Sequence, residues 1–168
     1  MAAQTRIDVD GTEAVSTVLL NLLNTFPGLS EGKRIRFSTV GPDEGIGFFP
    51  VSGAVFLKNK ESITGHVTQE CQYPFSILYC AAPKTEKQRL RIKEFLDTLG
   101  KWLELQSVTV DGESVRLDGY PPLDAGNRKI TAIARINAAH LNAAYENGVE
   151  DWGFSAALTY RNEYDKPD

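Results

Sequence analysis

Two histidines, His66 and His140, are the side chains with which this sequence of 168 residues could activate a nucleophile. A serine, cysteine or threonine nucleophile needs a base within hydrogen-bond reach, and that base is most often histidine. His66 follows a glycine at the start of an apolar stretch, and His140 follows two alanines in a segment that we expect to be a loop. Neither lies in a GxSxG or HExxH pattern. We therefore expect surface or loop histidines, no catalytic residues and a protein that is not an enzyme.

Acidic and glycine-rich segments offer two further kinds of site. Adjacent acids occur at Asp43/Glu44 and Glu150/Asp151, and residues 41–47 are rich in glycine. That stretch has no following GK[ST], and its two acids would repel a phosphate group. We expect a turn at residues 41–47, a solvated corner at each acid pair, and no cofactor-binding residues.

Two cysteines, Cys71 and Cys80, are the candidate metal ligands or redox groups. They lie nine positions apart in one predicted strand, which places them on opposite faces and out of reach of each other. The sequence has no CxxC motif and no His/Cys cluster. We expect two buried or half-buried free thiols and no metal-binding residues.

Composition and charge restrict the partners. The hydrophobic and aromatic fractions, 42% and 10%, are those of a globular protein with a core, and the net charge is -4 without a run of Lys and Arg. The longest apolar stretch, residues 18–23, is too short for a membrane span. The first ten residues lack the pattern of a secretory signal. We expect a protein made and kept in a cytosol, with no membrane partner, no nucleic-acid-binding residues and no sequence-specific nucleic-acid partner.

Two helices are predicted from apolar residues at helical spacing. The first covers residues 10–26, with Asp10 and Glu13 as a capping pair. The second covers residues 85–105, where Thr85 and Gln88 repeat the capping pattern and an apolar stripe runs from Ile92 to Leu103. Its charged side predicts an ordinary solvated surface.

Alternating apolar residues predict five strands, at about residues 33–38, 46–57, 67–81, 129–136 and 151–164. Pro74 in the third predicts a sheet edge or a bulge, because proline cannot donate to the ladder. We expect 129–136 to be a central strand, 58–61 a polar loop and 106–127 mostly loop, with Val108 and Val110 in a small hairpin. The alternating aromatic residues predict a core face, not a stack for nucleic-acid bases.

The order of helix, strands, helix, strands indicates an α+β protein. We predict a single domain over residues 1–168, in which a mostly antiparallel sheet packs against two main helices.

Three segments in this order carry a family resemblance. They are residues 72–79 (QYPFSILY), residues 91–103 (RIKEFLDTLGKWL) and residues 147–154 (NGVEDWGF) running on to 158–160 (LTY). The set resembles minor capsid proteins of phages and prophages of Gram-positive bacteria, which look like tail terminators. The closing strand is also similar in character to that of tail terminators from lambdoid phages.

The resemblance implies a tail-terminator-like fold and a structural role without cofactor, metal or reaction. Such proteins form a ring, a homohexamer, at the head-proximal end of the tail. The ring ends polymerisation of the tail tube, and of the sheath in a contractile tail, and offers a surface to the head. The implied partners are further copies of the chain, the tail-tube protein, the sheath protein where the tail contracts, and the head–tail connector. The implied location is the tail or neck of a virion, after synthesis in the bacterial cytoplasm.

Ring contacts between unlike patches fit that role. The strand that contains Pro74, or the closing strand, is expected to pair across subunits, and residues 41–47 and 107–127 to meet the tube or the neck. Two alternatives remain open. One is a head–tail connector or head-completion protein of the neck. The other is a small-molecule-binding or enzymatic α+β domain of the host, whose clustered aromatic residues line a pocket.

Overall fold

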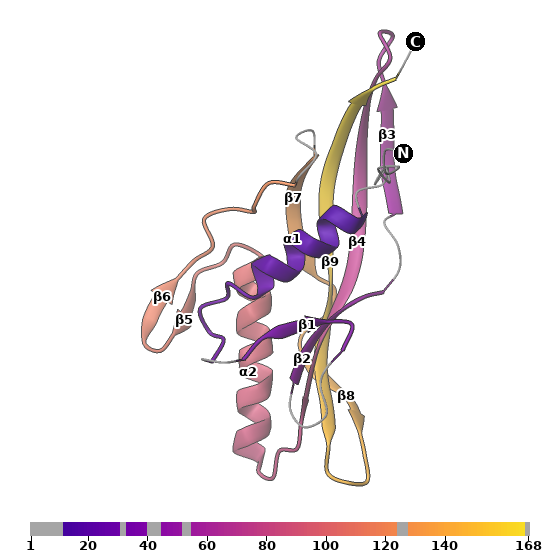
Figure 1. Ribbon diagram of the computed structural model, residues 1–168. Helices are drawn as coiled ribbons and strands as arrows, with labels where there is room; N and C mark the ends of the chain where they lie inside the picture. The colour runs from indigo at the N-terminus through magenta and orange to yellow at the C-terminus, as the bar shows by residue number, and fades with distance from the viewer. Residues whose placement is uncertain (1–11, 31–32, 40–44, 52–54, 124–127, 167–168) are drawn as a thin grey trace, which may run out of the picture.

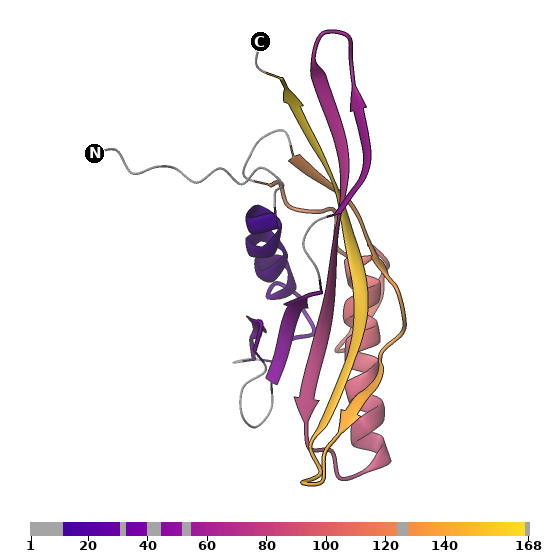
Figure 2. The same ribbon diagram turned by 90° about the vertical axis from the view of Figure 1, so that its right-hand side faces the viewer.

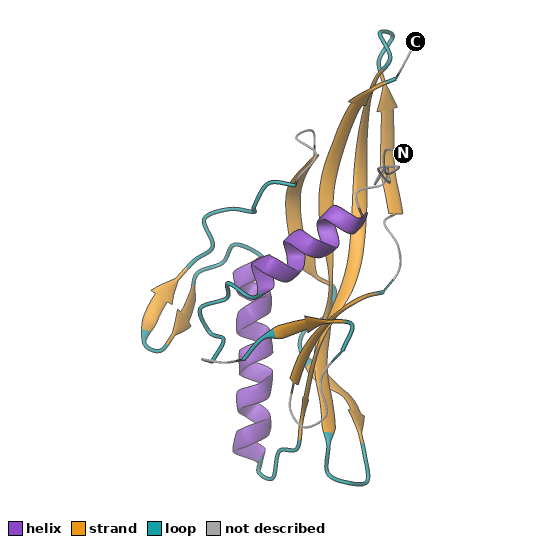
Figure 3. Cartoon of the chain, viewed as in Figure 1, coloured by secondary structure: helices purple, strands orange, loops and turns teal. Residues whose placement is uncertain are grey.

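The computed structural model describes residues 12–30, 33–39, 45–51, 55–123 and 128–166. In this part of the chain, two helices and nine strands follow one another (Figures 1 and 3). In chain order they are α1 (Thr12–Leu23), β1 (Ile35–Phe37), β2 (Gly45–Pro50), β3 (Val55–Glu61), β4 (His66–Ala81), α2 (Glu86–Leu103), β5 (Val108–Val110), β6 (Glu113–Val115), β7 (Arg128–Arg135), β8 (His140–Ala144) and β9 (Glu150–Asp165).

The two longest strands, β4 and β9, form the centre of the sheet. They pair antiparallel over all sixteen residues of each strand, from His66 opposite Asp165 to Ala81 opposite Glu150. Side chains alternate between the two faces of a strand, and the core face carries the large ones. The members of this face that are at most 2% exposed are Val67, Cys71, Tyr73, Phe75, Ile77, Phe154, Ala156, Leu158 and Tyr160. The predicted aromatic core face is therefore confirmed.

Both helices cover this same face of the sheet. Buried leucines of α1 and of α2 belong to one core cluster with the aromatic side chains of β4. Phe26, just after α1, joins the helices because its ring centroid lies 5.8 Å from that of Phe95 and 5.2 Å from that of Trp102. In Figure 2, α2 lies behind β8 and β9, and α1 lies to the left of the strands.

The second helix begins as its sequence predicts. The side chain of Thr85 accepts a hydrogen bond from the Gln88 N–H at 3.2 Å, and the Gln88 side chain accepts one from the Lys84 N–H at 2.6 Å. Together they satisfy two donors at the helix start. For α1 the proposed cap Asp10 lies outside the described residues.

The position of Pro74 corrects one prediction. The main path of the sheet runs β1-β2-β4-β9-β7, and β3 pairs with β4 beyond the end of β2. β4 is therefore an interior strand, not an edge, and so is β9. Pro74 lies between the last residue paired with β2 and the first paired with β3. Because none of the described strands pairs with β4 on this side at Pro74, a residue without an N–H is tolerated there.

Other predicted strand assignments were also wrong in part. The segment 46–57 is two strands, β2 and β3, and β3 includes residues 58–61, which were predicted to be a loop. β1 pairs with β2 in parallel. β7 is an outer strand, not a central one, and β8 occupies a segment predicted to be a loop. The hairpin at Val108 and Val110 is confirmed as β5–β6.

The free edge of β7 is covered by side chains. The Ile133 N–H donates to the Tyr120 hydroxyl at 3.2 Å, and the Arg135 N–H donates to Glu104 Oε2 at 3.3 Å. Tyr120 also donates to the Leu103 carbonyl at 2.7 Å, which ties the segment between β6 and β7 to the end of α2. Covering an edge in this way prevents another strand from pairing with it.

Replacing Tyr120 by Phe should lower the free energy of unfolding by about 1–3 kcal/mol, because it leaves the Ile133 N–H and the Leu103 carbonyl without their partner. Ile133 and Leu103 are at most 3% exposed, so water does not easily replace the Tyr120 hydroxyl as their partner. Urea unfolding followed by tryptophan fluorescence measures the change. Tyr145→Phe is the control, since Tyr145 is 53% exposed, and it should alter the urea midpoint much less. Equal shifts in the two variants would contradict the role given to Tyr120.

Candidate functional site

The two histidines lie far apart in different surroundings. His66 begins β4 at the sheet end and its Nδ1 lies 2.8 Å from Asp165 Oδ1, with both side chains largely exposed. His140 begins β8, not a loop, and its Nδ1 lies 3.0 Å from the Ala138 carbonyl oxygen. In these contacts each ring is held by an acid or a main-chain oxygen and not by a nucleophile.

The acid pair Glu150/Asp151 was predicted to be a solvated corner in a loop. This prediction is wrong, because the two residues are the first of strand β9. The Glu150 carboxylate is buried against α2, where it accepts two hydrogen bonds from Arg89 Nε and one from Arg89 Nη2 at 3.0–3.1 Å. Trp152 Nε1 donates to the same carboxylate at 3.0 Å. Glu150 therefore joins the end of the sheet to the first turns of α2. Asp43 and Glu44 lie outside the described residues.

A second carboxylate, Asp97, is also part of a network and not of a solvated helix surface. It is paired with Lys93, accepts the Ala139 N–H at 2.9 Å, and lies 3.8 Å from Arg135. Arg135 also donates to Glu104 at 2.7 Å. Although burial raises the pKa of Asp97, the hydrogen bonds and the two cations lower it, and the pKa ends below its ordinary value. These pairs fasten α2 to β7 and to the segment before β8.

The Arg89–Glu150 pair gives the stability of the fold a dependence on pH. Hydrogen bonds from Arg89 lower the pKa of Glu150 below its ordinary value of about 4.3, against a smaller opposite effect of burial. A carboxylate with a lowered pKa stabilises the folded state above its unfolded pKa, and this stabilisation is lost as the pH falls through the folded pKa. When the pH is lowered from 5 to 3, the urea midpoint of the Glu150→Gln variant should therefore fall less than that of the unchanged protein.

Arg89→Gln tests whether Arg89 is what lowers the pKa of Glu150, because it leaves the carboxylate in place and removes its partner. It should show the same weakened dependence on pH as Glu150→Gln. Urea titrations at four pH values between 3 and 6 measure the slopes. Slopes equal to that of the unchanged protein in both variants would refute the assignment.

The cysteines are free and buried. Cys71 belongs to the core, and Cys80 lies on the other face beside Asp151, its partner across the strands. Burial and the neighbouring Asp151 carboxylate raise the pKa of Cys80, so its thiol stays protonated at neutral pH. Among the described residues, no three His, Cys, Asp or Glu side chains converge as a metal site requires.

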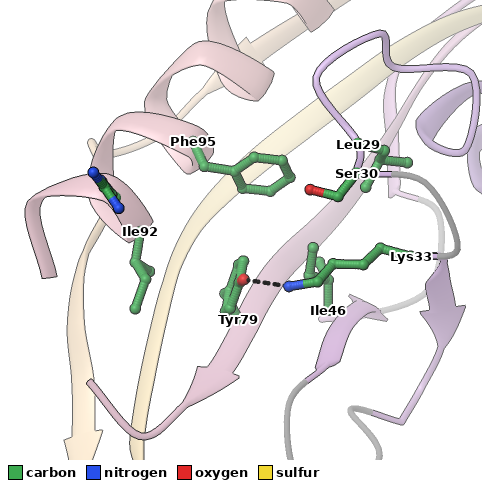
Figure 4. A pocket seen from close by; sticks show the side chains of 8 residues that line it. Leu29, Ser30, Lys33, Ile46, Tyr79, Ile92 and Phe95 are labelled. Atoms are coloured by element: carbon green, nitrogen blue, oxygen red, sulfur yellow. Dashed lines mark hydrogen bonds between the residues drawn. The ribbon is translucent and has the colours of Figure 1, made fainter. Parts of the chain in front are cut away.

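A small pocket lies between α2, β4 and the segment before β1 (Figure 4). Lys33 Nζ donates to the Tyr79 hydroxyl at 3.0 Å and lies 5.4 Å from the centroid of the same ring. The pocket has a volume of about 110 Å³, well below the ~300 Å³ at which small-molecule sites begin. Its eight described lining residues include two cations and no acid, namely Leu29, Ser30, Lys33, Ile46, Tyr79, Arg91, Ile92 and Phe95. The arrangement suits a small anion more than a metabolite.

One surface feature is a three-stranded extension that we call the arm. It consists of β3, residues 66–72 of β4 and residues 159–165 of β9. Figure 2 shows the arm projecting past both helices. Its end is the arm tip, Ser62, Ile63, Thr64 and Gly65, which connects β3 to β4. The side chain of Ile63 is fully exposed, at 107%.

A second surface feature is a hollow that we call the groove, between the outer side of α1 and the segment that follows β6. Its volume is about 420 Å³. The eight described lining residues are all uncharged and are Val18, Asn21, Leu22, Thr25, Leu117, Gly119, Tyr120 and Pro121. The residues 117–121 that form one wall belong to a segment predicted to be free loop, but Tyr120 packs against the core.

The sequence matches no protein-family model, and no curated protein is significantly similar to it. Within the described residues, neither helix combines the length and the hydropathy that a membrane-spanning helix needs.

Proposed function

We propose that this protein is a structural component of a phage particle or of a phage tail-like particle, and that its copies form a ring at the head-proximal end of the tail. The ring ends polymerisation of the tail tube, and of the sheath where the tail contracts. It also presents the surface that joins the head. The resemblance of residues 72–79, 91–103 and 147–160 to tail terminators supports this assignment.

The arm is the observation that carries the proposal. A subunit in a ring meets its two neighbours through two different patches, and an element that extends beyond its own core is suited to reach a neighbour. Within the arm, β9 pairs with β4 as far as His66 at its end. A projection of paired strands beyond the core is suited to an assembly contact.

The main chain of the arm is not its strongest contact candidate. The outer edge of β3 carries Lys58 and Lys60, both exposed, and lysines on an edge strand disfavour pairing with another strand. The expected pairing through the strand with Pro74 or through the closing strand is disfavoured over most of their length, because β4 lies between β9 and β2 or β3, and β9 lies between β4 and β7 or β8. Assembly through side chains at the end of the arm fits these constraints better.

Two measurements on the purified protein test the proposal. Sedimentation velocity over a concentration series should give a closed oligomer, expected to be a hexamer from the resemblance. Addition to a polymerising tail-tube protein should shorten the tubes seen by electron microscopy. A protein that stays monomeric and leaves tube length unchanged would refute the proposal. Cryo-electron microscopy of the particle separates the alternative, because density beside the portal and not at the tube end would assign the chain to the neck connectors.

A further inference from the structure

The arm tip presents one apolar side chain, that of Ile63, on a hydrogen-bonded turn. Gly65 N–H donates to the Ser62 carbonyl at 3.0 Å, which places Ile63 and Thr64 at the two central positions of a tight turn. Gly65 has φ +84°, a conformation that glycine adopts without strain. The side-chain oxygens of Ser62 and Thr64 lie 2.9 Å apart, which braces the turn below Ile63. Residues at such positions are commonly Gly, Pro, Asn, Asp or Ser, so a fully exposed isoleucine there is unusual.

Further bonds hold the tip against the end of β9. The Lys166 N–H donates to the Gly65 carbonyl at 2.8 Å, and Lys166 Nζ donates to Glu61 at 2.9 Å. His66 pairs with Asp165 on the same end. Holding the exposed side chains of these pairs in place costs conformational entropy, and these exposed contacts bury little surface to offset that cost. The result is a rigid tip whose charged groups are paired below it and whose outermost side chain is Ile63.

The groove has the matching chemistry. Val18, Leu22, Leu117 and Pro121 make it mostly apolar, and no charged residue lies among its described lining. The four residues of the arm tip are uncharged as well. A buried charge without a partner opposes docking, and this pairing contains none. The Lys33 pocket offers a poorer fit, because its volume is about 110 Å³ and two cations line it.

We infer that the arm tip of one copy docks in the groove of a second copy, with Ile63 buried between α1 and the segment 117–121. This inference rests on the proposed ring and names its contact. The two surfaces belong to different parts of the chain, so the contact is heterologous and repeats from copy to copy until the ring closes. An isoleucine that is fully exposed in one copy loses its contact with water only when another molecule covers it.

The first test places a charge on either side of the contact. Ile63→Asp puts a carboxylate into the apolar groove, and Asn21→Arg puts a cation on the exposed side of α1 in the groove wall. Each variant should weaken self-association roughly 10- to 100-fold, the range expected from burial of one large apolar side chain. Both positions are exposed in the single chain, so the circular dichroism spectrum and the urea midpoint should stay close to those of the unchanged protein. Ile136→Asp is the matched control, since Ile136 is also exposed, at 65%, but lies away from both surfaces.

The double variant distinguishes a direct contact from two separate effects. If the carboxylate introduced at the arm tip of one copy meets the guanidinium introduced in the groove of the next, the two charges attract each other. The combined variant Ile63→Asp/Asn21→Arg should then associate at least about fivefold more tightly than either single variant. Sedimentation velocity gives the dissociation constants of the unchanged protein, the two single variants and the double variant, which together form a double-mutant cycle. Strictly additive losses in the double variant would overturn the inference.

Tube-shortening assays separate failure of this inference from failure of the proposed function. An unchanged protein that forms rings and shortens tubes, together with an Ile63→Asp variant that does both equally well, overturns the docking contact and leaves the function in place. If Ile63→Asp keeps the ring but no longer shortens tubes, the tip binds the tube protein and the inference is also overturned. An unchanged protein that neither associates nor acts on tubes refutes both.

Discussion

Replacing Phe154 by Ala should lower the free energy of unfolding by about 3–5 kcal/mol, the largest effect that we expect from a single substitution. Phe154 is 2% exposed and lies opposite Ile77, which is fully buried, in the ladder of β4 and β9. Both helices pack on this face, so truncation leaves a cavity that the neighbours cannot fill without moving the sheet. Urea unfolding at neutral pH, followed by circular dichroism, measures the loss.

Phe37→Ala is the control for that result. Phe37 lies on the short strand β1 and is 45% exposed, although its ring touches that of Phe48 at a centroid distance of 5.5 Å. Its truncation should cost clearly less than that of Phe154, because it removes less buried surface. A loss at Phe154 no greater than that at Phe37 would show that the ladder is not the centre of the core.

Replacing Gly153 by Ala should destabilise the protein by about 1–3 kcal/mol or more, although it adds one methyl group. Gly153 is buried on β9, on the face opposite Phe154. An added Cβ would meet the Ile77 carbonyl oxygen on the paired strand and the Leu78 side chain at less than 3 Å. Because one of these atoms is main chain in the central ladder, the strands have to separate to admit it.

The control for this substitution is Gly119→Ala. A Cβ at Gly119 meets no atom within 4 Å, and its φ is not in the left-handed region. We expect a neutral or slightly stabilising change there, since alanine lowers the entropy of the unfolded chain. Thermal unfolding of both variants should thus move in opposite directions or differ by several degrees. Similar midpoints would mean that β4 and β9 leave room for a methyl group at Gly153.

The elements with strong periodicity could be predicted from the sequence. The predicted bounds of α2, β4 and β9 agree with the observed ones to within one or two residues. The apolar stripe of α2 and the alternating aromatic residues of the two strands made this possible. The weak cases had no such signal. Residues 58–61 are exposed on both faces of β3, and β8 has no β-branched residue, so neither shows the alternation of a half-buried strand.

Relations between distant segments could not be predicted from one sequence. Pro74 indicates a missing donor, but which strands flank it depends on β2 and β3 together. The buried state of Glu150 depends on Arg89, which lies 61 positions earlier. Of the residues in the proposed docking contact, only Ile63 stands out in the sequence, as an apolar residue within a polar turn. The groove is made by segments about a hundred positions apart, and no spacing reveals it.

The ladder of β4 and β9 also fixes the order in which the molecule becomes complete. Its partner residues are separated by 69 to 99 positions, so pairing requires a large loop to close first. The pair with the shortest separation is Ala81 with Glu150, and the longest is His66 with Asp165, at the arm tip. The hairpin of β3 and β4 pairs residues close in sequence, whereas the third strand of the arm is added only when residues 159–165 of β9 pair with residues 66–72 of β4. The arm therefore gains its third strand only after residues 159–165 have been made, although its tip lies on a hairpin that closes over a short loop.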